Sequence, residues 1–406
     1  MGTERRLLMI SLDAVSSDDL EILQELPNFS KLRKKGTLVR DVKSVLISNT
    51  YPAHTSIITG THPNKHGVID NTLLLPERKS AKWRYHTGDI KVPTLFHKAK
   101  EQGLTTCSIL YPVTGSAKID YNILEIAGEM NPLKRAYIML RHGSARYLIS
   151  NLLRFRKYIK GIGQPALDDL TTAVAADGLV RYKPNLLALH LIDTDMQKHR
   201  YGINSEQTLE SLHRQDERLG ILMDALEKSG TSDKTSIIIF SDHDSLPVHT
   251  GINPNNFLIE QGIIQQTKDK LNRYDAYFHN AGGTTFLKLY NPKAEHGVRQ
   301  AIDLFLKEPY VARKLTNEEM QVSGMDKEYM VGIEATDGYY FGKPGYKAQH
   351  GYALERAGYT PFYLAVGKGI QQGEALSGGC ITDICPLAAN MLGIPLWDMD
   401  GINRLN

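Results

Sequence analysis

The sequence has few cysteines and no long hydrophobic run. Its 406 residues include three cysteines, Cys107, Cys380 and Cys385. This odd, sparse count argues against a disulfide framework and fits a reducing compartment. No apolar run approaches the length that spans a membrane, and the first residues, MGTERR, are not followed by the apolar region and cleavage site of a signal peptide. We therefore expect a cytoplasmic protein.

The sequence also has no strong excess of charge of either sign. Its formal net charge of +3 gives no reason to expect nucleic acid as a partner. Hydrophobic residues make up 41% of the chain and charged residues 23%, so a sizeable core is available. The chain is too long for an ordinary small domain but fits one large α/β core with insertions. We expect one domain over residues 1–406.

Apolar runs alternate with helical patterns along the chain. Nearly continuous apolar runs, typical of parallel strands covered on both faces, lie at 7–12, 105–110, 185–192 and 235–241. Helical patterns, each ended by a glycine, lie at 28–35, 94–102, 205–228 and 382–392. The alternation predicts an α/β fold, a three-layer α/β/α sandwich around a mostly parallel sheet.

Aspartates follow three of the expected strands. Asp13 closes the first run, Asp195 follows the run at 185–192, and Asp242 follows the run at 235–241. One aspartate after a strand is usually a turn former or a helix cap, but three of them are harder to explain in that way. Ligands of α/β sheets bind beyond the carboxyl ends of the strands. We expect these side chains to meet at one edge of the sheet.

Histidines accompany the aspartates. Asp195 and His199 are four residues apart, which places them on one face of a helical turn, either to bind a cation or as an exposed pair. His243 follows Asp242 directly. His350, in KAQHGY, is a candidate late ligand, although a lone histidine is more often a loop residue. Mixed oxygen and nitrogen ligands suit two divalent metal ions, zinc best, with manganese or another divalent ion as the alternative.

Thr50 is placed to act as a nucleophile. Pro52 suits the first turn of a helix, so Thr50 would stand at a helix N-terminus, where unpaired backbone N–H groups favour a phosphate oxygen. Binding to a metal would activate its hydroxyl, which is a poor nucleophile at neutral pH. Alternatively, Thr50 is a plain N-cap. Two cations around a hydroxyl predict an in-line phosphoryl transfer.

The stretch NTYPAHTSIITGTHPNKHGVIDN, residues 49–71, strongly resembles the nucleophile segment of the nucleotide pyrophosphatase/phosphodiesterase branch of the alkaline phosphatase superfamily. The candidate ligands match that family in type and order. The C-terminal run ITDICPLAANMLGIPLWDMDG resembles the closing helix and loop of the superfamily. The resemblance implies an alkaline-phosphatase-like fold and a phosphodiesterase or nucleotide pyrophosphatase with a phosphothreonine intermediate.

The resemblance also implies a role for each residue of the site. Thr50 would be the nucleophile, and Asn71 would donate to a non-bridging phosphate oxygen. The two metal ions would be held by Asp13, Thr50, Asp242 and His243 on one side, and by Asp195, His199 and His350 on the other.

The chain departs from the family pattern at two positions. The family usually has Asp-Gly where this chain has Asp13-Ala14, and Asp-His-Gly where this chain has Asp242-His243-Asp244. Neither change removes a ligand. Asp244 would place additional negative charge near a metal, so the departures bear on fine specificity and not on the class of reaction.

The sequence leaves the substrate open. A small phosphate ester, such as a nucleotide, is the expected partner. Tyr51 could stack on a nucleobase or an aryl leaving group, or it could be a core aromatic at the start of a helix. A basic segment at 76–86 would favour a phosphomonoester or a phosphonate if it folded over the site, and would otherwise be a solvated loop. The alternatives are a phosphomonoesterase, a phosphonoacetate hydrolase-like enzyme and a non-catalytic binding protein.

Two segments do not fit the strand–helix alternation. Residues 114–165 are expected to include an inserted basic helical cap or arm, since 131–163 contain eight Lys or Arg residues and no Asp or Glu. Such an arm could form the contact between two copies in a homodimer, or it could bind to an anionic surface. We expect its apolar residues to pack on the core, and we do not expect contact with a membrane. A second insertion is expected at 268–340.

Overall fold

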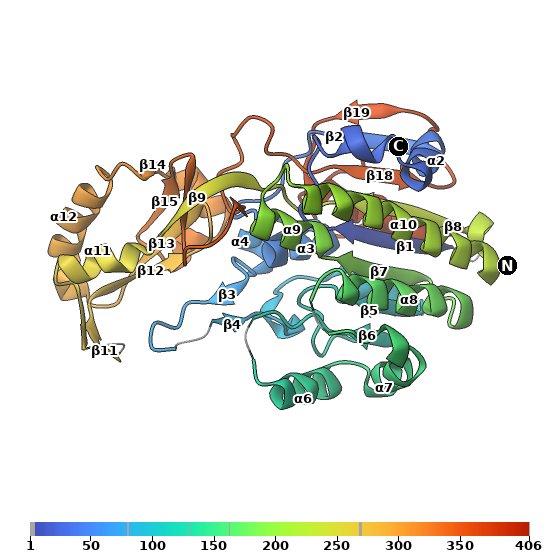
Figure 1. The fold of residues 1–406 in the computed structure, drawn as a ribbon, viewed down its shortest axis with the longest axis horizontal. Coiled ribbons are helices and arrows are strands. Elements are labelled where there is room, and N and C mark those ends of the chain that lie inside the picture. Colours follow the sequence, from blue (N-terminus) through green and yellow to red (C-terminus); the bar gives the residue numbers. More distant parts are fainter. Residues whose placement is uncertain (1–4, 79–80, 129, 162, 268–269, 406) are drawn as a thin grey trace.

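The computed structural model describes residues 5–78, 81–128, 130–161, 163–267 and 270–405. A central sheet of eight strands forms the larger part of the molecule (Figure 1). In spatial order the strands are β19 (Ala375–Ser377), β2 (Gly36–Arg40), β18 (Tyr363–Val366), β8 (Thr235–Phe240), β1 (Arg6–Leu12), β7 (Leu186–Leu191), β5 (Thr106–Ile109) and β6 (Tyr121–Ile123).

The central sheet is mostly parallel, as predicted. β8, β1, β7, β5 and β6 run in the same direction. β18 is antiparallel to both of its neighbours, β8 and β2, whereas β19 is parallel to β2. The carboxyl ends of the central strands therefore lie at one edge of the sheet.

Alternation of side chains along β1 explains the three layers. Leu8, Ile10 and Leu12 pack into one hydrophobic cluster, and Leu7 and Met9 pack into another on the opposite face. The helices of the first cluster include α2 (Pro27–Lys34), α8 (Ala166–Arg181) and α10 (Glu206–Ser229). Those of the second are α3 (Thr50–Thr59), α5 (Leu95–Glu101) and α14 (Ile384–Leu392). Burial of both faces confirms the expected α/β/α sandwich.

All the strands and helices expected from the sequence are present, with ends that differ by one or two residues. The structure adds β2, β6, β18 and β19 to the sheet. These additional strands are three to five residues long. Strands of that length are too short for their periodicity to stand out in a sequence.

A smaller lobe lies at one end of the central sheet (Figure 1). Its antiparallel sheet has the order β12 (Ala276–Asn280), β13 (Thr284–Leu289), β15 (Val331–Ala335) and β14 (Val311–Lys314). The lobe has a hydrophobic cluster of its own, to which α11 (Pro254–Glu260) and α12 (Glu295–Phe305) contribute. A second sheet connects it to the sandwich through β16 (Gly338–Phe341), β9 (Leu246–Ile252) and β17 (Ala348–Gln349). The lobe thus includes elements that precede the predicted insertion at 268–340.

The basic segment forms helices beside the edge strand β6. They are α6 (Pro132–His142), α7 (Ala145–Arg154) and the short 3-10 helix η2 (Arg156–Tyr158), and they lie at the lower edge of the view (Figure 1). The predicted range of 114–165 also contains β6, which belongs to the central sheet. Throughout the described residues, no helix is both long enough and apolar enough to cross a membrane.

Candidate active site

Three neighbouring parallel strands carry predicted ligands to one edge of the sheet. Asp13 directly follows β1, and Asp242 lies just beyond β8. β7 leads into α9 (Asp193–Tyr201), which carries Asp195 and His199. Because β8, β1 and β7 are adjacent and run in the same direction, these side chains meet where the sequence predicts.

The predicted ligands form two groups of three residues. The groups are Asp13, Asp242 and His243, and Asp195, His199 and His350. Within each group, one ligand atom from each residue lies within 4.8 Å of the others. His350 joins its group from the loop that follows β17. Residues separated by more than half of the chain are therefore close enough to share a cation.

Thr50 lies beside the first group. It is the first residue of α3, which follows the extended residue Asn49 and ends at Gly60 in a left-handed conformation. Pro52 occupies the first turn of this helix, as predicted. The Oγ1 of Thr50 is 3.2 Å from Nε2 of His243. The candidate nucleophile thus faces a candidate ligand.

The three imidazoles present the same ring nitrogen to the site. Each Nδ1 has an oxygen acceptor, and donation of an N–H to that oxygen leaves Nε2 as a metal ligand. The acceptors are the carbonyl of Ala348 for His199 at 2.8 Å, the carbonyl of Asp244 for His243 at 3.2 Å, and Oδ1 of Asn49 for His350 at 2.7 Å. These contacts select the tautomer that a metal requires.

Three carboxylate oxygens in the site are buried without a hydrogen-bond partner among the described residues. They belong to Asp13, Asp195 and Asp242. Leaving a buried carboxylate oxygen unsatisfied is costly, whereas a divalent cation would satisfy it. All three belong to the predicted ligand set, so the residues fit a divalent metal ion in each group.

The charges of the first group also favour a cation. Burial, with Asp242 and Asp195 nearby, raises the pKa of Asp13 well above its ordinary value. Burial also opposes ionisation of Asp242, but neighbouring histidines, His243 foremost, lower its pKa. Burial lowers the pKa of His243 to about 4 and that of His350 well below its ordinary value. Both imidazoles are therefore in the neutral form that binds metals.

The structure adds two buried histidines that the sequence analysis did not single out. Nε2 of His190 lies 2.9 Å from Oδ2 of Asp13, and its Nδ1 lies 2.6 Å from Oε2 of Glu125. Nδ1 of His54 lies 3.3 Å from Oδ2 of Asp242. His190 thus orients Asp13, whereas Nδ1 of His54 lies closer to the backbone carbonyl oxygen of Thr50, at 2.8 Å, than to Asp242. The only signal for His190 in the sequence is a polar residue inside the apolar run LLALHL.

A chain of hydrogen bonds supports the His350 ring at its Nδ1 atom. Nδ2 of Asn49 donates to Asp70 at 2.7 Å, while Oδ1 of Asn49 accepts from His350. Asp70 in turn lies 2.8 Å from Nε2 of His279, whose Nδ1 is 2.7 Å from the hydroxyl of Tyr329. His279 and Tyr329 come from the smaller lobe and its surroundings, so that lobe helps to position the second group.

The side chain of Asn71, which is not part of α3, contacts the first turn of this helix beside Thr50. Its Oδ1 accepts a hydrogen bond of 2.8 Å from the backbone N–H of Tyr51. This contact uses the carbonyl end of the amide and directs the Nδ2 donor away from it. Asn71 precedes β3 (Thr72–Leu73), which pairs with β4 (Lys82–Trp83) in the basic segment at 76–86. Residues 79–80 of that segment lie outside the described residues.

Comparison with known proteins decides the family. The sequence profile of the type I phosphodiesterase / nucleotide pyrophosphatase family matches residues 7–352. The chain belongs to this family. The matched range contains every candidate ligand, Thr50 and Asn71.

Relatives in this family match the chain to different extents. Human ectonucleotide pyrophosphatase/phosphodiesterase family member 1 is 28% identical over 242 residues, which cover 58% of this chain and 23% of the human protein. This chain thus spans about a quarter of the length of the first curated relatives that it matches. Mouse bis(5'-adenosyl)-triphosphatase enpp4 is 23% identical over 401 residues, which cover 96% of this chain and 78% of the mouse protein.

Solved structures of the family show the same fold. Murine ectonucleotide pyrophosphatase / phosphodiesterase 5, as an inactive variant in complex with AMP, superposes with a TM-score of 0.72 at 17% identity, covering 98% of this chain and 97% of that chain. The human counterpart gives a TM-score of 0.71 at 19% identity, with the same coverage. At this identity the similarity establishes the fold alone, and it confirms the alkaline-phosphatase-like sandwich.

Lys198 contacts both residues at which the chain departs from the family pattern, Ala14 and Asp244. It is buried in α9, between Asp195 and His199. Its Nζ donates to the carbonyl of Ala14 at 2.8 Å and lies 3.5 Å from Oδ1 of Asp244. Burial raises the pKa of Asp244 to about 7, while the nearby Lys198 acts to lower it. The carboxyl group of Asp244 therefore does not simply add one negative charge to the site.

The position of Tyr51 argues against a role in stacking on the substrate. Its side chain is fully buried and packs with Trp83, Val68 and Val113. The rings of Tyr51 and Trp83 meet edge to face at 5.3 Å. Because no face of the Tyr51 ring is exposed, a substrate has nothing to stack on. The structure favours the alternative of a core aromatic at the start of a helix, and the assignment of Tyr51 to substrate binding is corrected accordingly.

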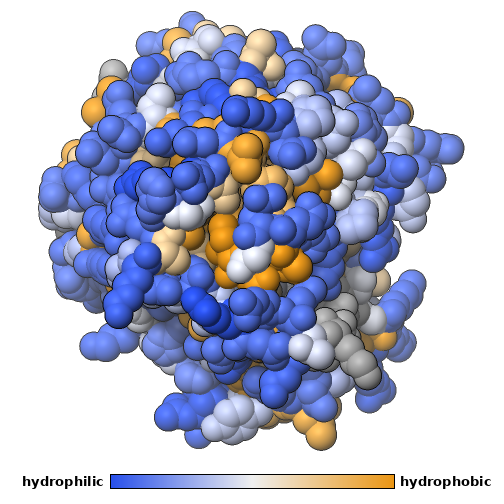
Figure 2. All heavy atoms as spheres, turned by 90° about the vertical axis from the view of Figure 1, so that its left-hand side faces the viewer, coloured by the Kyte–Doolittle hydropathy of each residue, from blue (hydrophilic) through white to orange (hydrophobic). Residues whose placement is uncertain are grey.

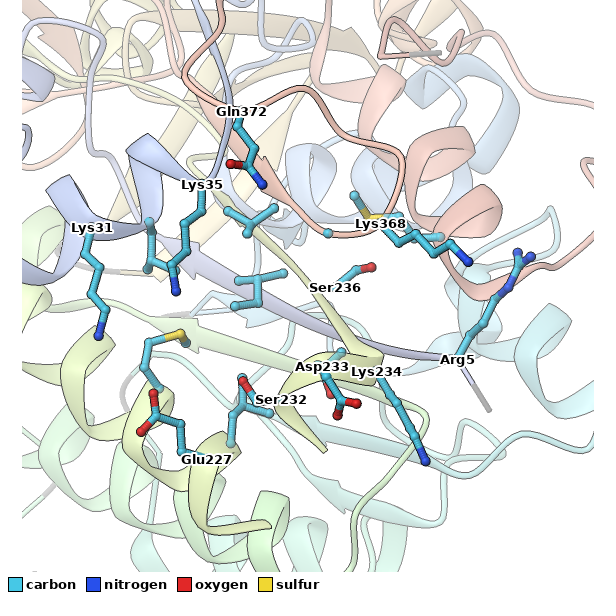
Figure 3. A pocket seen from close by; sticks show the side chains of 18 of the residues that line it. Arg5, Lys31, Lys35, Glu227, Ser232, Asp233, Lys234, Ser236, Lys368 and Gln372 are labelled. Carbon is cyan, nitrogen blue, oxygen red and sulfur yellow. The ribbon is translucent and has the colours of Figure 1, made fainter. Parts of the chain in front are cut away.

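A cavity of about 1070 Å³ lies at the opposite edge of the sheet, near the start of β1 and β8. Basic side chains on its rim include Arg5, Lys31, Lys35, Lys234 and Lys368. Their charged ends point in different directions and do not converge on one point (Figure 3). The labelled side chains of this cavity therefore do not converge as the side chains of the two ligand groups do.

Proposed function

We propose that this chain is a metal-dependent phosphodiesterase that hydrolyses small phosphate esters of the nucleotide type. Thr50 is its nucleophile, and two divalent metal ions, zinc or a related ion, are held by the two ligand groups. The buried carboxylate oxygens of Asp13, Asp195 and Asp242 that lack a hydrogen-bond partner, grouped with the imidazoles of His199, His243 and His350, are the observation that carries this proposal.

Thr50 and Asn71 have different roles in the proposed reaction. When bound, the divalent ions would lower the pKa of the Thr50 hydroxyl and neutralise the phosphoryl oxygens. The Thr50 hydroxyl loses its proton to solvent and its oxygen attacks phosphorus in line. The bond between Thr50 and phosphorus forms, and the leaving group departs with the electron pair of the bond that breaks. Thr50 then carries the phosphoryl group as a phosphothreonine intermediate until water releases it. Asn71, held by the Tyr51 N–H, offers its Nδ2 to a non-bridging oxygen.

The relatives support a nucleotide substrate. Their names describe nucleotide pyrophosphatases, phosphodiesterases and a bis(5'-adenosyl)-triphosphatase, and one structural relative was solved with AMP. A substrate with a nucleoside on one side of the phosphate and a leaving group on the other fits a diesterase that cleaves one of two ester bonds. Tyr51 would not contact the base, since it is buried.

A panel of substrates tests the proposal. The purified chain is assayed with bis-p-nitrophenyl phosphate, p-nitrophenyl phosphate, a nucleotide 5′-p-nitrophenyl ester and phosphonoacetate, each with added zinc and with a chelator. We expect the nucleotide ester to be turned over fastest, with activity lost on chelation and restored by zinc. Faster turnover of the monoester or of phosphonoacetate would reject the diesterase assignment in favour of the corresponding alternative.

Two substitutions of Thr50 form a matched pair for the same assay. Thr50→Val keeps the shape of the side chain but removes the hydroxyl, so we expect the rate to fall on the order of 10³-fold or more. Thr50→Ser keeps a hydroxyl and should retain measurable activity. Equal activity of Thr50→Val and the unaltered chain would reject Thr50 as the nucleophile. Metal and nucleotide binding without turnover in the unaltered chain would instead indicate a non-catalytic binding protein.

A further inference from the structure

The helices that follow β6 form a surface with two kinds of side chain. We call residues 131–160, which include α6, α7 and η2, the α6–η2 surface. Figure 1 shows α6 and α7 at the outer edge of the molecule, beyond the last strand of the central sheet. This position leaves them with one side toward the sandwich and the other toward solvent.

α6 has an apolar stripe that does not face the protein. Leu133, Tyr137 and Leu140 are spaced i, i+4 and i+7, so they share one face of the helix. Leu133 is 81% exposed and Tyr137 is 65% exposed. Ile138 lies on a different face and packs against the protein. The exposed stripe is therefore additional to the face that buries α6.

α7 repeats this arrangement. Tyr147 and Leu148 join the main hydrophobic cluster of the sandwich. Ile149, Leu152 and Leu153, spaced i, i+3 and i+4, are exposed, and Leu153 is 69% exposed. Beyond α7, Tyr158 and Ile159 are exposed as well. The expectation that the apolar residues of this segment pack on the core is thus wrong for the stripes of both helices.

The same surface is basic. Arg135 donates to the carbonyls of Ile126 and Gly128, and Arg154 pairs with Asp177, so these two charges are used within the protein. The structure shows no ion-pair partner within the described residues for the other six basic side chains. These are Lys134, Arg141, Arg146, Arg156, Lys157 and Lys160. With no acidic residue from 131 to 163, nothing on the segment itself neutralises them.

We propose that the α6–η2 surface binds membranes that contain anionic lipids. Exposed aliphatic and tyrosine side chains can enter the headgroup boundary while neighbouring Lys and Arg side chains contact lipid phosphates and carboxylates. A second copy of this chain fits the surface less well, because a two-fold contact through the same face would bring like charges together. A nucleic acid would meet aliphatic side chains that offer it neither charge nor stacking.

Sedimentation with lipid vesicles tests the proposal on the full chain. Vesicles of phosphatidylcholine alone are compared with vesicles that also contain phosphatidylserine, at low and at high salt. We expect the chain to pellet with the anionic vesicles, and the bound fraction to fall as salt screens the charges. Failure to bind anionic vesicles, or equal binding to both kinds, would overturn the proposal.

Substitutions locate the binding to this surface. Lys134→Glu/Arg146→Glu should weaken binding by about fivefold or more for each charge, and Leu133→Ser/Leu153→Ser should weaken it as well. The control is Leu304→Ser/Leu396→Ser, since Leu396 is 61% exposed and Leu304 is exposed on another helix. The control should bind as the unaltered chain does. Thermal unfolding of all variants confirms that each one is folded.

Two outcomes of the same experiments would assign the surface to another partner and overturn the proposal. One is a dimer, seen by light scattering, that dissociates in Leu133→Ser/Leu153→Ser. The other is release of the chain from vesicles by duplex DNA at equal phosphate concentration. None of the substituted residues contributes to the site around Thr50. Hydrolysis of a soluble substrate should therefore stay unchanged, and the membrane proposal can fail without affecting the proposed activity.

Discussion

At the scale of single residues, Lys198 explains how the site tolerates an aspartate where the family has a glycine. Its Nζ donates to Oδ2 of Asp19 at 2.7 Å and lies 3.5 Å from Asp244, and both Lys198 and Asp244 are buried. The sequence predicted additional negative charge at Asp244 but not its partner. Lys198 and Asp244 lie on different elements, so only the folded structure shows that they meet.

Removal of Lys198 should destabilise the protein. Lys198→Met leaves the carboxylates of Asp19 and Asp244 without their buried cation, which typically costs about 3–5 kcal/mol. We expect a lower free energy of unfolding in a denaturant titration. The double variant Lys198→Met/Asp244→Asn removes one of the stranded charges and should recover on the order of 1–3 kcal/mol. Additive losses in the double variant would contradict a direct interaction between Lys198 and Asp244.

At the scale of elements, the start of α9 is held by side chains from two other helices. Oδ2 of Asp168, in α8, accepts hydrogen bonds from the backbone N–H groups of Ile192 at 2.8 Å and Asp193 at 2.9 Å. Arg218, in α10, lies 3.0 Å from Asp193. The sequence predicted the helical spacing within α9 but not these contacts, because they depend on how α8 and α10 pack on the sheet.

The Asp168 contact predicts a pH dependence of stability. Burial raises the pKa of Asp168 to about 6, although Arg218 nearby acts to lower it. A carboxyl with a raised pKa in the folded state binds its proton more tightly there, so its contribution to stability falls as pH rises from about 4 to about 6 and stays low above that range. Relative to Asp168→Asn, the unaltered chain should lose up to about 3 kcal/mol of unfolding free energy across this range.

Urea titrations of both proteins at several pH values measure this difference. Asp168→Asn keeps an oxygen that can accept from Ile192 and Asp193 but has no titrating group. If the difference in unfolding free energy is independent of pH between about 4 and 7, the raised pKa of Asp168 is contradicted.

The two ligand groups lie on different elements, so they should lose metal separately. His350→Ala removes a ligand from the group on α9 and the loop after β17, while Asp13, Asp242 and His243 are unchanged. We expect the purified variant to retain about half of the zinc bound by the unaltered chain, as measured by elemental analysis. His296→Ala, a substitution of an exposed histidine in α12, should retain all of it. If His350→Ala retained all of its zinc, the assignment of His350 to a second metal site would be contradicted.

At the scale of the whole molecule, the smaller lobe contributes to the site. The N–H of Gly283 donates to the carbonyl of His350 at 2.8 Å, and His279 belongs to the chain of hydrogen bonds behind Asn49. The sequence located this lobe only as an irregular segment at 268–340. Its short antiparallel strands lack the strong periodicity of the central strands, whereas the buried parallel strands and the aspartates after them were evident in the sequence.

The contact between the smaller lobe and His350 should be sensitive to the addition of one methyl group at Gly282. Gly282 has a φ of 80°, and a Cβ there would lie 2.3 Å from the carbonyl oxygen of His350. Gly282→Ala should therefore displace His350 and weaken zinc binding, by about tenfold or more. Gly262→Ala is the control, since its φ of 72° imposes similar backbone strain while no atom lies within 4 Å of the added Cβ. Equal zinc affinities would contradict the coupling.

The stereochemistry at phosphorus tests the central claim, that Thr50 forms a covalent intermediate. One diastereomer of a nucleotide phosphorothioate p-nitrophenyl ester is hydrolysed in heavy-oxygen water, and the configuration of the product is determined. Attack by Thr50 followed by attack of water comprises two in-line displacements, each of which inverts phosphorus. The account predicts net retention of configuration. Net inversion would mean that water attacks the substrate directly, and it would contradict the role of Thr50.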